Sequence, residues 1–223
     1  MKRQPNLTLT GPPSGVVEVW SVSLDSPALP LELLAAPVSE AEREHAKRMT
    51  VGGAEWAAAH GALRTILGGY LGTAPRTLKF RRTPNGKPRL ADVRGLEFSF
   101  SLTDGLAVIA VASDREVGVD VERENDRTHV EDVARAFLSP VEVAAVESAP
   151  AETQRTAFFA AWARHEARLK LLGRGLGDTA AEALDPGTLV VTRRLVMRPG
   201  YAAAVAAEGG SWALRVREFE LPG

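Results

Sequence analysis

The apolar residues of this chain come in short runs, and the length of those runs is the feature that most restricts its possible folds. The run LAVIAVA covers residues 106–112, and no apolar run in the sequence is longer than seven residues. Seven residues suit one β-strand but are far too few for a helix that crosses a bilayer. We therefore expect a fold that contains β-sheet and no interaction with a membrane.

Hydrophobic periodicity predicts both strands and helices. Residues 16–23, VVEVWSVS, alternate apolar and polar side chains as a strand does. Strand-like segments also occur at residues 96–101, 106–112, 117–121, 189–195, 202–207 and 211–218, and helix-like segments at residues 55–71, 130–137 and 157–172. Ser39, with Glu42 three residues later, predicts a capping box at the start of a further helix. Together these segments indicate an α+β fold.

Composition excludes several classes of function. The 223 residues include 27 basic and 28 acidic side chains, for a net charge of −1, and no cysteine. Balanced charge argues against broad electrostatic binding to nucleic acid or to an anionic membrane. Without cysteine there are no disulfides, thiol nucleophiles or thiolate metal sites, so a metal would need carboxylates or the four histidines. The N-terminal MKRQPNLTLT is basic but no apolar run follows it, so we expect no secretory signal and a cytoplasmic protein.

Charge is distributed along the chain in two bands. Residues 76–94 contain seven basic side chains and one acid, whereas residues 114–132 contain eight acids and three arginines. Such bands could form a site that holds a polyanion through a divalent cation. The simpler interpretation is two solvated loops, and charge alone favours it.

Two carboxylates fall on one face of the strand-like segment 117–122, VGVDVE. Alternation sends its valines toward a core and places Gly118, Asp120 and Glu122 on the opposite face, with the two carboxylates about 7 Å apart. A hard divalent cation such as Mg²⁺ would relieve their repulsion, and Gly118 would leave room for a ligand. An exposed strand face near a loop is an equally good interpretation of these residues alone.

The segment 158–176, FFAAWARHEARLKLLGRGL, has an apolar stripe at helical spacing and a glycine-rich end. The spacing makes Trp162 a core residue. Glu166 and Lys170 lie four residues apart on a flank, where they suggest an ordinary surface ion pair. Gly173 is suited to end the helix.

The two segments together resemble the paired signature of the Sfp-type 4′-phosphopantetheinyl transferases. That family's pattern is G-[V/I]-D-[V/I]-E, then W-x-x-K-E-[A/S]-x-x-K, then G-x-G-L. The matching positions are Asp120, Glu122, Trp162, Glu166, Ala167, Lys170, Gly173, Gly175 and Leu176. Asn85-Gly86-Lys87-Pro88 resembles the family's G-K-P turn, Ser101-Leu102-Thr103 its S-H-[S/T] motif, residues 39–48 its early helix, and residues 134–142 its R-F-F-[S/T]-x-x-E segment. The resemblance runs from about residue 30 to residue 195.

The resemblance implies an α+β fold of two pseudo-twofold-related α/β subdomains with the active site between them. We expect an N-terminal subdomain at residues 1–113 on the nucleotide side of coenzyme A, and a C-terminal subdomain at residues 114–223 with the acids and the catalytic helix. Both halves place a helix before strands, which also leaves open an internal duplication with its seam near Ser113. The implied reaction transfers 4′-phosphopantetheine from coenzyme A to a serine of an apo acyl or peptidyl carrier protein and releases 3′,5′-ADP. We expect a monomer that serves polyketide or nonribosomal peptide synthesis.

The resemblance also implies roles for individual residues. Asp120, Glu122 and Glu166 would bind Mg²⁺, with Mn²⁺ as an alternative. Glu166 is the first choice as base for the carrier serine, directly or through a water, and the resemblance leaves the other carboxylates as alternatives. Lys170 would stabilise charge on the transferring phosphate or on the leaving group. The implied contacts to coenzyme A are Arg48, Gly86, Lys87, Pro88, Ser101, Thr103 and His165, with Lys87 at the nucleotide end. Phe137 and Leu138 would lie near the carrier protein.

Three positions depart from the family pattern. The histidine of S-H-[S/T] is Leu102 here, the lysine of W-x-x-K-E is His165, and an early-helix arginine is replaced near Ala57. All three positions would ordinarily hold phosphates of coenzyme A, whereas the carboxylates are intact. The alternative is therefore a catalytically degenerate homologue that binds carrier proteins or nucleotides without transferring the arm.

Overall fold

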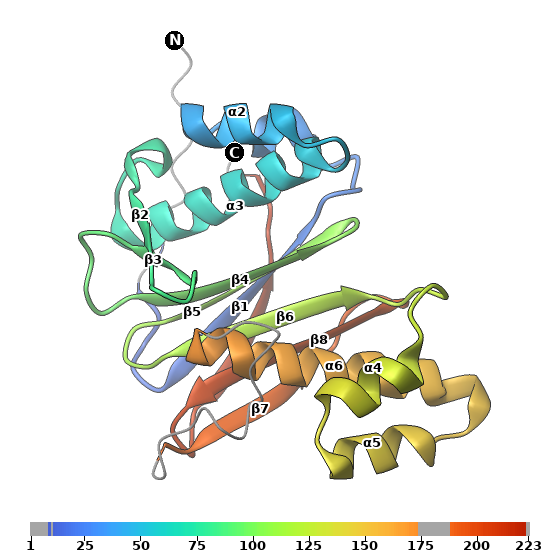
Figure 1. Cartoon of the computed structure of the whole chain (residues 1–223). Helices are drawn as coiled ribbons and strands as arrows, with labels where there is room; N and C mark the ends of the chain where they lie inside the picture. Colours follow the sequence, from blue (N-terminus) through green and yellow to red (C-terminus); the bar gives the residue numbers. More distant parts are fainter. Residues whose placement is uncertain (1–8, 10, 174–187, 222–223) are drawn as a thin grey trace.

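The computed structural model describes residues 9, 11–173 and 188–221 of the chain (Figure 1). Its strands are β1 (Val16–Ser23), β2 (Phe80–Arg82), β3 (Pro88–Leu90), β4 (Glu97–Thr103), β5 (Leu106–Ala112), β6 (Val117–Arg123), β7 (Val190–Leu195), β8 (Tyr201–Glu208) and β9 (Ala213–Glu218). Its helices are α1 (Leu31–Leu34), α2 (Glu40–Arg48), α3 (Gly53–Leu71), the 3₁₀ turn η1 (Pro75–Thr77), α4 (Val130–Phe137), α5 (Pro140–Glu147) and α6 (Ala151–Leu172). The mixed content confirms the predicted α+β class.

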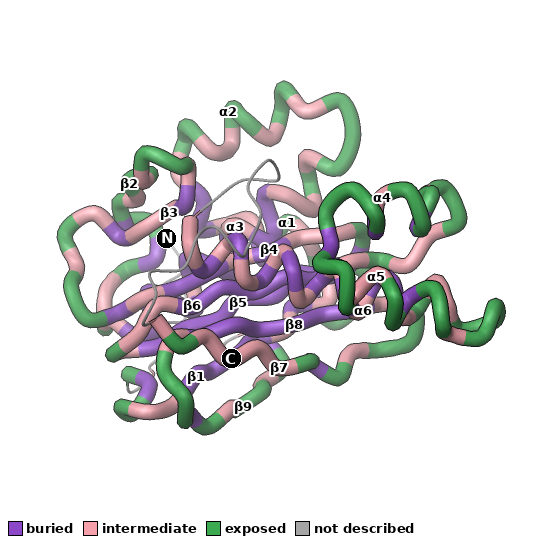
Figure 2. Tube along the Cα trace, turned by 60° about the horizontal axis from the view of Figure 1, so that its bottom comes forward, coloured by how far each residue is buried: buried purple, intermediate pink, exposed green. Residues whose placement is uncertain are grey.

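The elements form four layers. Helix α3 covers one face of a four-stranded sheet of order β4-β5-β1-β9, and the opposite face packs on a three-stranded sheet of order β6-β8-β7 (Figure 1). Helix α6 covers the outer face of the second sheet. Buried residues follow β5, β6 and β8 through the centre, whereas α2 and α4 lie mostly at the surface (Figure 2).

Strand β5 explains why the two sheets stack. All seven of its residues are buried, because alternate side chains enter the core under α3 and the core between the sheets. Its predicted bounds, 106–112, are confirmed. Strand β9 comes from the end of the chain but pairs in parallel with β1. It therefore joins the first sheet from beyond residue 113, and the division into residues 1–113 and 114–223 stays a prediction.

Local sequence signals fix several helix ends. The predicted capping box of Ser39 and Glu42 is present at α2, and Ser139 and Glu142 form a second one at α5. Helix α3 ends at Gly72, which adopts a left-handed conformation. Helix α6 begins at Ala151, six residues before the start of the predicted helix at residue 157. Among the described residues, no helix combines the length and the apolar character that a membrane crossing requires.

Candidate active site

Strand β6 and helix α6 lie in direct contact at Gly118. A Cβ added to Gly118 would lie 2.0 Å from the Ala167 carbonyl oxygen and 2.4 Å from the Leu171 backbone nitrogen. The expectation that this glycine leaves room for a ligand is therefore wrong, because the backbone of α6 fills that space. The glycine instead lets α6 pack closely against the face of β6 that carries Asp120 and Glu122.

Three elements meet at the carboxylate of Asp120. Its side chain is 3% exposed, and Oδ1 accepts hydrogen bonds from Lys170 Nζ at 2.6 Å and from Ser101 Oγ at 2.8 Å. Lys170 Nζ also donates to Ser101 Oγ at 2.7 Å. Lys170 thus pairs with Asp120 on β6. It does not form the surface ion pair with Glu166 that the helical spacing suggested. Ser101 on β4 brings the first sheet into the cluster.

The carboxylates of this cluster have oxygen atoms without partners. Asp120 Oδ2 and Glu166 Oε1 are buried and have no hydrogen-bond partner among the described residues. Burial raises the pKa of Glu166 above its ordinary value, and the charge of Asp120 raises it further. Burial and the same charge raise the pKa of Glu122 to about 7, although Trp162 Nε1 donates a hydrogen bond to Glu122 Oε1 at 3.1 Å. Negative charge is therefore concentrated where water cannot reach it fully, and a cation would relieve the repulsion.

The donor set fits a hard cation that takes its remaining ligands from elsewhere. Asp120, Glu122 and Glu166 offer only oxygen atoms, which Mg²⁺ prefers. Within residues 9, 11–173 and 188–221, no three acidic or histidine side chains already converge as a complete metal-binding group. Mg²⁺ commonly uses one or two carboxylates together with waters and substrate phosphates. The two unpartnered carboxylate oxygens are suited to such an incomplete protein site.

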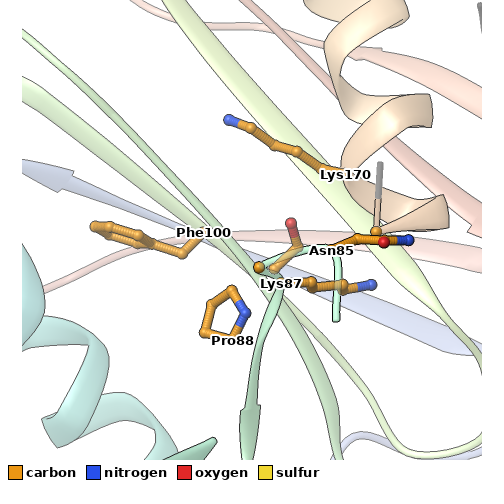
Figure 3. A pocket seen from close by; sticks show the side chains of 8 residues that line it. Asn85, Lys87, Pro88, Phe100 and Lys170 are labelled. Atoms are coloured by element: carbon orange, nitrogen blue, oxygen red, sulfur yellow. The ribbon is translucent and has the colours of Figure 1, made fainter. Parts of the chain in front are cut away.

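A cavity of about 210 Å³ lies beside this cluster (Figure 3). Its lining residues are Asn85, Gly86, Lys87, Pro88, Ser99, Phe100, Lys170 and Gly173. The turn that begins at Thr83 forms one wall, with Gly86 N donating to Thr83 O at 2.8 Å and Gly86 at a φ of 88°. The structure thus brings Gly86, Lys87, Pro88 and Lys170 to one cavity, as the resemblance implies.

The two lysines of the cavity differ in what their ammonium groups contact. Their amino groups point in opposite directions in Figure 3. Lys170 bonds with the Asp120 cluster, whereas Lys87 Nζ donates to Glu116, to the Val117 carbonyl and to the Leu171 carbonyl. Glu116 also pairs with Arg89, so the basic and acidic bands partly neutralise each other.

The other predicted contacts to coenzyme A lie outside the lining of this cavity. His165 is 3% exposed and stacks on Trp162 at 5.6 Å between ring centroids, and its Nε2 has no partner among the described residues. Thr103 Oγ1 accepts a hydrogen bond from Arg123 N at 3.3 Å. Arg48 is exposed at the end of α2. Leu102 packs against the core under α3. Gly175 and Leu176 of the glycine-rich motif lie outside the described residues.

Ser99 and Phe100 also line the cavity, although no sequence motif indicated either residue. Ser99 Oγ also accepts a hydrogen bond from Val119 N at 3.0 Å. Together with Ser101 and Thr103, it forms a row of hydroxyls at alternate positions of β4, and each contacts β6. Because side chains two apart in a strand share a face, this alternation is a signal that the sequence alone offered.

Comparison with known proteins gives one consistent family. Residues 116–214 match the family model of the 4′-phosphopantetheinyl transferase superfamily. The chain is 34% identical over 234 residues to the 4′-phosphopantetheinyl transferase HetI of Nostoc sp. strain PCC 7120, covering 95% of this chain and 94% of that protein. It is 26% identical over 171 residues to a 4′-phosphopantetheinyl transferase of Bacillus subtilis, covering 72% of each. The matched residues include β6 and α6, and this chain belongs to the 4′-phosphopantetheinyl transferase superfamily.

Proposed function

We propose that this protein transfers 4′-phosphopantetheine from coenzyme A to a serine of an apo acyl or peptidyl carrier protein and releases 3′,5′-ADP. The observation that carries the proposal is the cluster of Asp120, Glu166 and Lys170 beside the cavity that Lys170 lines. Two buried carboxylate oxygens of this cluster have no hydrogen-bond partner in the part of the chain that the structure describes. The membership of the chain in the superfamily supports the type of reaction.

Asp120, Glu122 and Glu166 would hold a divalent cation, Mg²⁺ or alternatively Mn²⁺. When bound, the ion neutralises pyrophosphate charge and makes the phosphorus more susceptible to attack. In the ion-free protein, the pKa values of Glu122 and Glu166 are raised, so these groups resist carrying their full negative charge without a counter-ion. The support for this assignment is the all-oxygen donor set and the unpartnered atoms described above.

Glu166 is the carboxylate we assign as base for the carrier serine, directly or through a water. Burial and the charge of Asp120 raise its pKa in the protein without a cation, so this carboxylate is more basic than an exposed glutamate. The serine hydroxyl gives its proton to Glu166, its oxygen forms a bond to the phosphorus, and the bond from phosphorus to the 3′,5′-ADP oxygen breaks. In the described part of the chain, Lys170 Nζ has two partners, Ser101 and Asp120. Its third N–H is left to stabilise charge on the transferred phosphate or the leaving group.

The proposed partners occupy different sides of the site. The Thr83–Pro88 turn would contact the nucleotide end of coenzyme A. Phe137, at the end of α4, is 39% exposed and stacks edge-on against Trp162, so a carrier docked there would lie near Glu122. Leu138 is buried, so it would support that surface from below and would not contact the carrier itself. We propose that the carriers belong to polyketide or nonribosomal peptide synthesis. We also propose that the protein is monomeric and cytoplasmic.

The test compares two isosteric substitutions on the same helix. Glu166→Gln keeps the shape of the side chain but removes its capacity to take a proton and to bind a cation as a carboxylate, so we expect at least about a 100-fold loss of transfer rate. Glu152→Gln alters an exposed glutamate in the first turn of α6 and should leave the rate unchanged. The rate is followed by the mass of an apo carrier protein incubated with coenzyme A and Mg²⁺.

An unchanged transfer rate in Glu166→Gln would show that Glu166 is not the base. Retained binding of coenzyme A and carrier without transfer by the unmodified protein would instead favour the degenerate homologue.

A further inference from the structure

The ammonium group of Lys87 is buried against the start of β6 and the last turn of α6. The side chain is 6% exposed, and Nζ donates to Glu116 Oε2 at 2.9 Å, to the Val117 carbonyl at 3.0 Å and to the Leu171 carbonyl at 3.1 Å. An ammonium has three N–H donors and no acceptor. All three donors are therefore engaged, and none is left for a phosphate oxygen.

The acceptors of Lys87 belong to the elements that carry the reactive groups. Val117 is the first residue of β6, which carries Asp120 three residues later. Leu171 lies in the last turn of α6, one residue after Lys170. Carbonyl groups in the last turn of a helix lack partners within the helix, and a cation there is also favoured by the helix dipole. Lys87 thus supplies a cap to α6 from a different part of the chain.

The backbone of Lys87 stabilises the turn that forms one wall of the cavity. The Lys87 carbonyl accepts from Thr83 N at 2.9 Å, and its backbone nitrogen donates to Thr83 Oγ1 at 3.1 Å. A Cβ added to Gly173, the cap of α6, would lie 3.7 Å from Lys87 Cβ, so the turn and the helix end are in contact. One side chain therefore connects the Thr83–Pro88 turn to both elements that hold the carboxylate cluster.

We infer that Lys87 is a positioning residue that fastens the cavity wall to β6 and α6, and not a ligand of a coenzyme A phosphate. This assignment differs from the nucleotide contact that the family resemblance implies. Only the test that measures binding of coenzyme A depends on the proposed function. The contacts of Lys87 with β6 and α6 exist in the protein without ligand.

The first test measures hydrogen exchange without any ligand. Lys87→Met keeps an apolar stem of similar length but removes the ammonium, so the amides of the Thr83–Pro88 turn and of the last turn of α6 should exchange about tenfold faster or more. Lys79→Met removes an exposed lysine from the same basic band and is the matched control, which should leave both segments unchanged.

The second test uses Glu116→Gln and measures binding of coenzyme A. Glu116 does not line the cavity, and glutamine still accepts a hydrogen bond, so this variant should fold. If Lys87 is a positioning residue, the variant removes its ionic partner and the Thr83–Pro88 turn becomes more mobile, so the affinity for coenzyme A falls a few-fold. If Lys87 is instead a phosphate ligand, the variant releases it from a competing carboxylate, so the affinity for coenzyme A rises. Lys87→Met should weaken coenzyme A and 3′-dephospho-coenzyme A by the same factor.

Unchanged exchange in Lys87→Met, or tighter binding in Glu116→Gln, would overturn the assignment. Faster exchange confined to the two named segments supports it. A complete failure of the unmodified protein to bind coenzyme A would count against the proposed function, and the exchange measurement would still decide the role of Lys87.

Discussion

At the scale of single residues, His60 shows how burial sets the charge of a side chain near the site. Its ring lies between Trp56, at 3.7 Å between centroids, and Phe100, at 5.1 Å. Phe100 lines the cavity. Burial lowers the pKa of His60 below its ordinary value of 6.5, although its Nδ1 lies 2.9 Å from the Trp56 carbonyl oxygen. The neutral imidazole is therefore the form that this stack stabilises.

This lowered pKa predicts a loss of stability in mild acid. Below the unfolded-state pKa of His60 the unfolded chain binds a proton that the folded chain does not, so the free energy of unfolding falls as pH drops through the folded-state value. Its contribution is complete above pH 6.5. Urea unfolding from about pH 8 to pH 5 measures this contribution as a difference between proteins, because Glu122, with its pKa raised to about 7, changes the free energy of unfolding in the opposite direction over the same range. As pH falls, His60→Phe, which keeps the stack, should gain stability relative to the unmodified protein, whereas His129→Gln, which alters an exposed histidine, should keep the slope of the unmodified protein. An unaltered slope in His60→Phe would contradict the assignment.

The residues of the candidate site could be predicted from the sequence better than their surroundings. Asp120, Glu166 and Lys170 follow from motif spacing, and the structure places them together. The burial of His165 beside Trp162 could not be predicted, because the spacing of apolar residues along a helix does not show which other elements pack against each of its sides. The same applies to Lys87, whose three acceptors are 29, 30 and 84 residues away along the chain.

At the scale of elements, the contact of β6 with α6 positions the site. Alternation in β6 was predicted correctly, but both of its faces are buried, since one meets the first sheet and the other meets α6. The short strands β2 and β3 and the helices α1 and α5 were not predicted. Three or four residues carry too little periodicity for β2, β3 and α1, and α5 has apolar residues on most of its faces.

Gly118 provides the test at this scale. In Gly118→Ala the added methyl group would collide with backbone atoms of α6, which cannot rotate away as a side chain can. We expect a loss of about 1–3 kcal/mol or more in the free energy of unfolding, and a loss of transfer activity because Glu166 and Lys170 shift relative to Asp120. Gly11→Ala, at an exposed glycine with open space around it, is the control in chemical denaturation. Equal stability and activity in both variants would contradict the close packing.

At the scale of the whole molecule, segments far apart in the sequence hold the site together. Glu18 on β1 is buried and accepts from Arg215 Nη1 at 2.7 Å and Arg217 Nη2 at 3.2 Å, both on β9. The end of the chain is thus tied to its first strand, while β4 and β6 meet through Ser101 and Asp120. Periodicity predicted the α+β class but not this stacking of two sheets, because strand order depends on pairings between distant segments.

The most direct measurement is the intact mass of apo carrier proteins incubated with this protein, coenzyme A and Mg²⁺. We predict that a carrier from polyketide or peptide synthesis gains the mass of one phosphopantetheine. We also predict that the gain disappears when EDTA is added, because the buried carboxylates would need a cation to accept the pyrophosphate. No gain across carriers of both classes, with coenzyme A and carrier still bound, would contradict the proposed transfer and indicate a protein that binds both partners without catalysis.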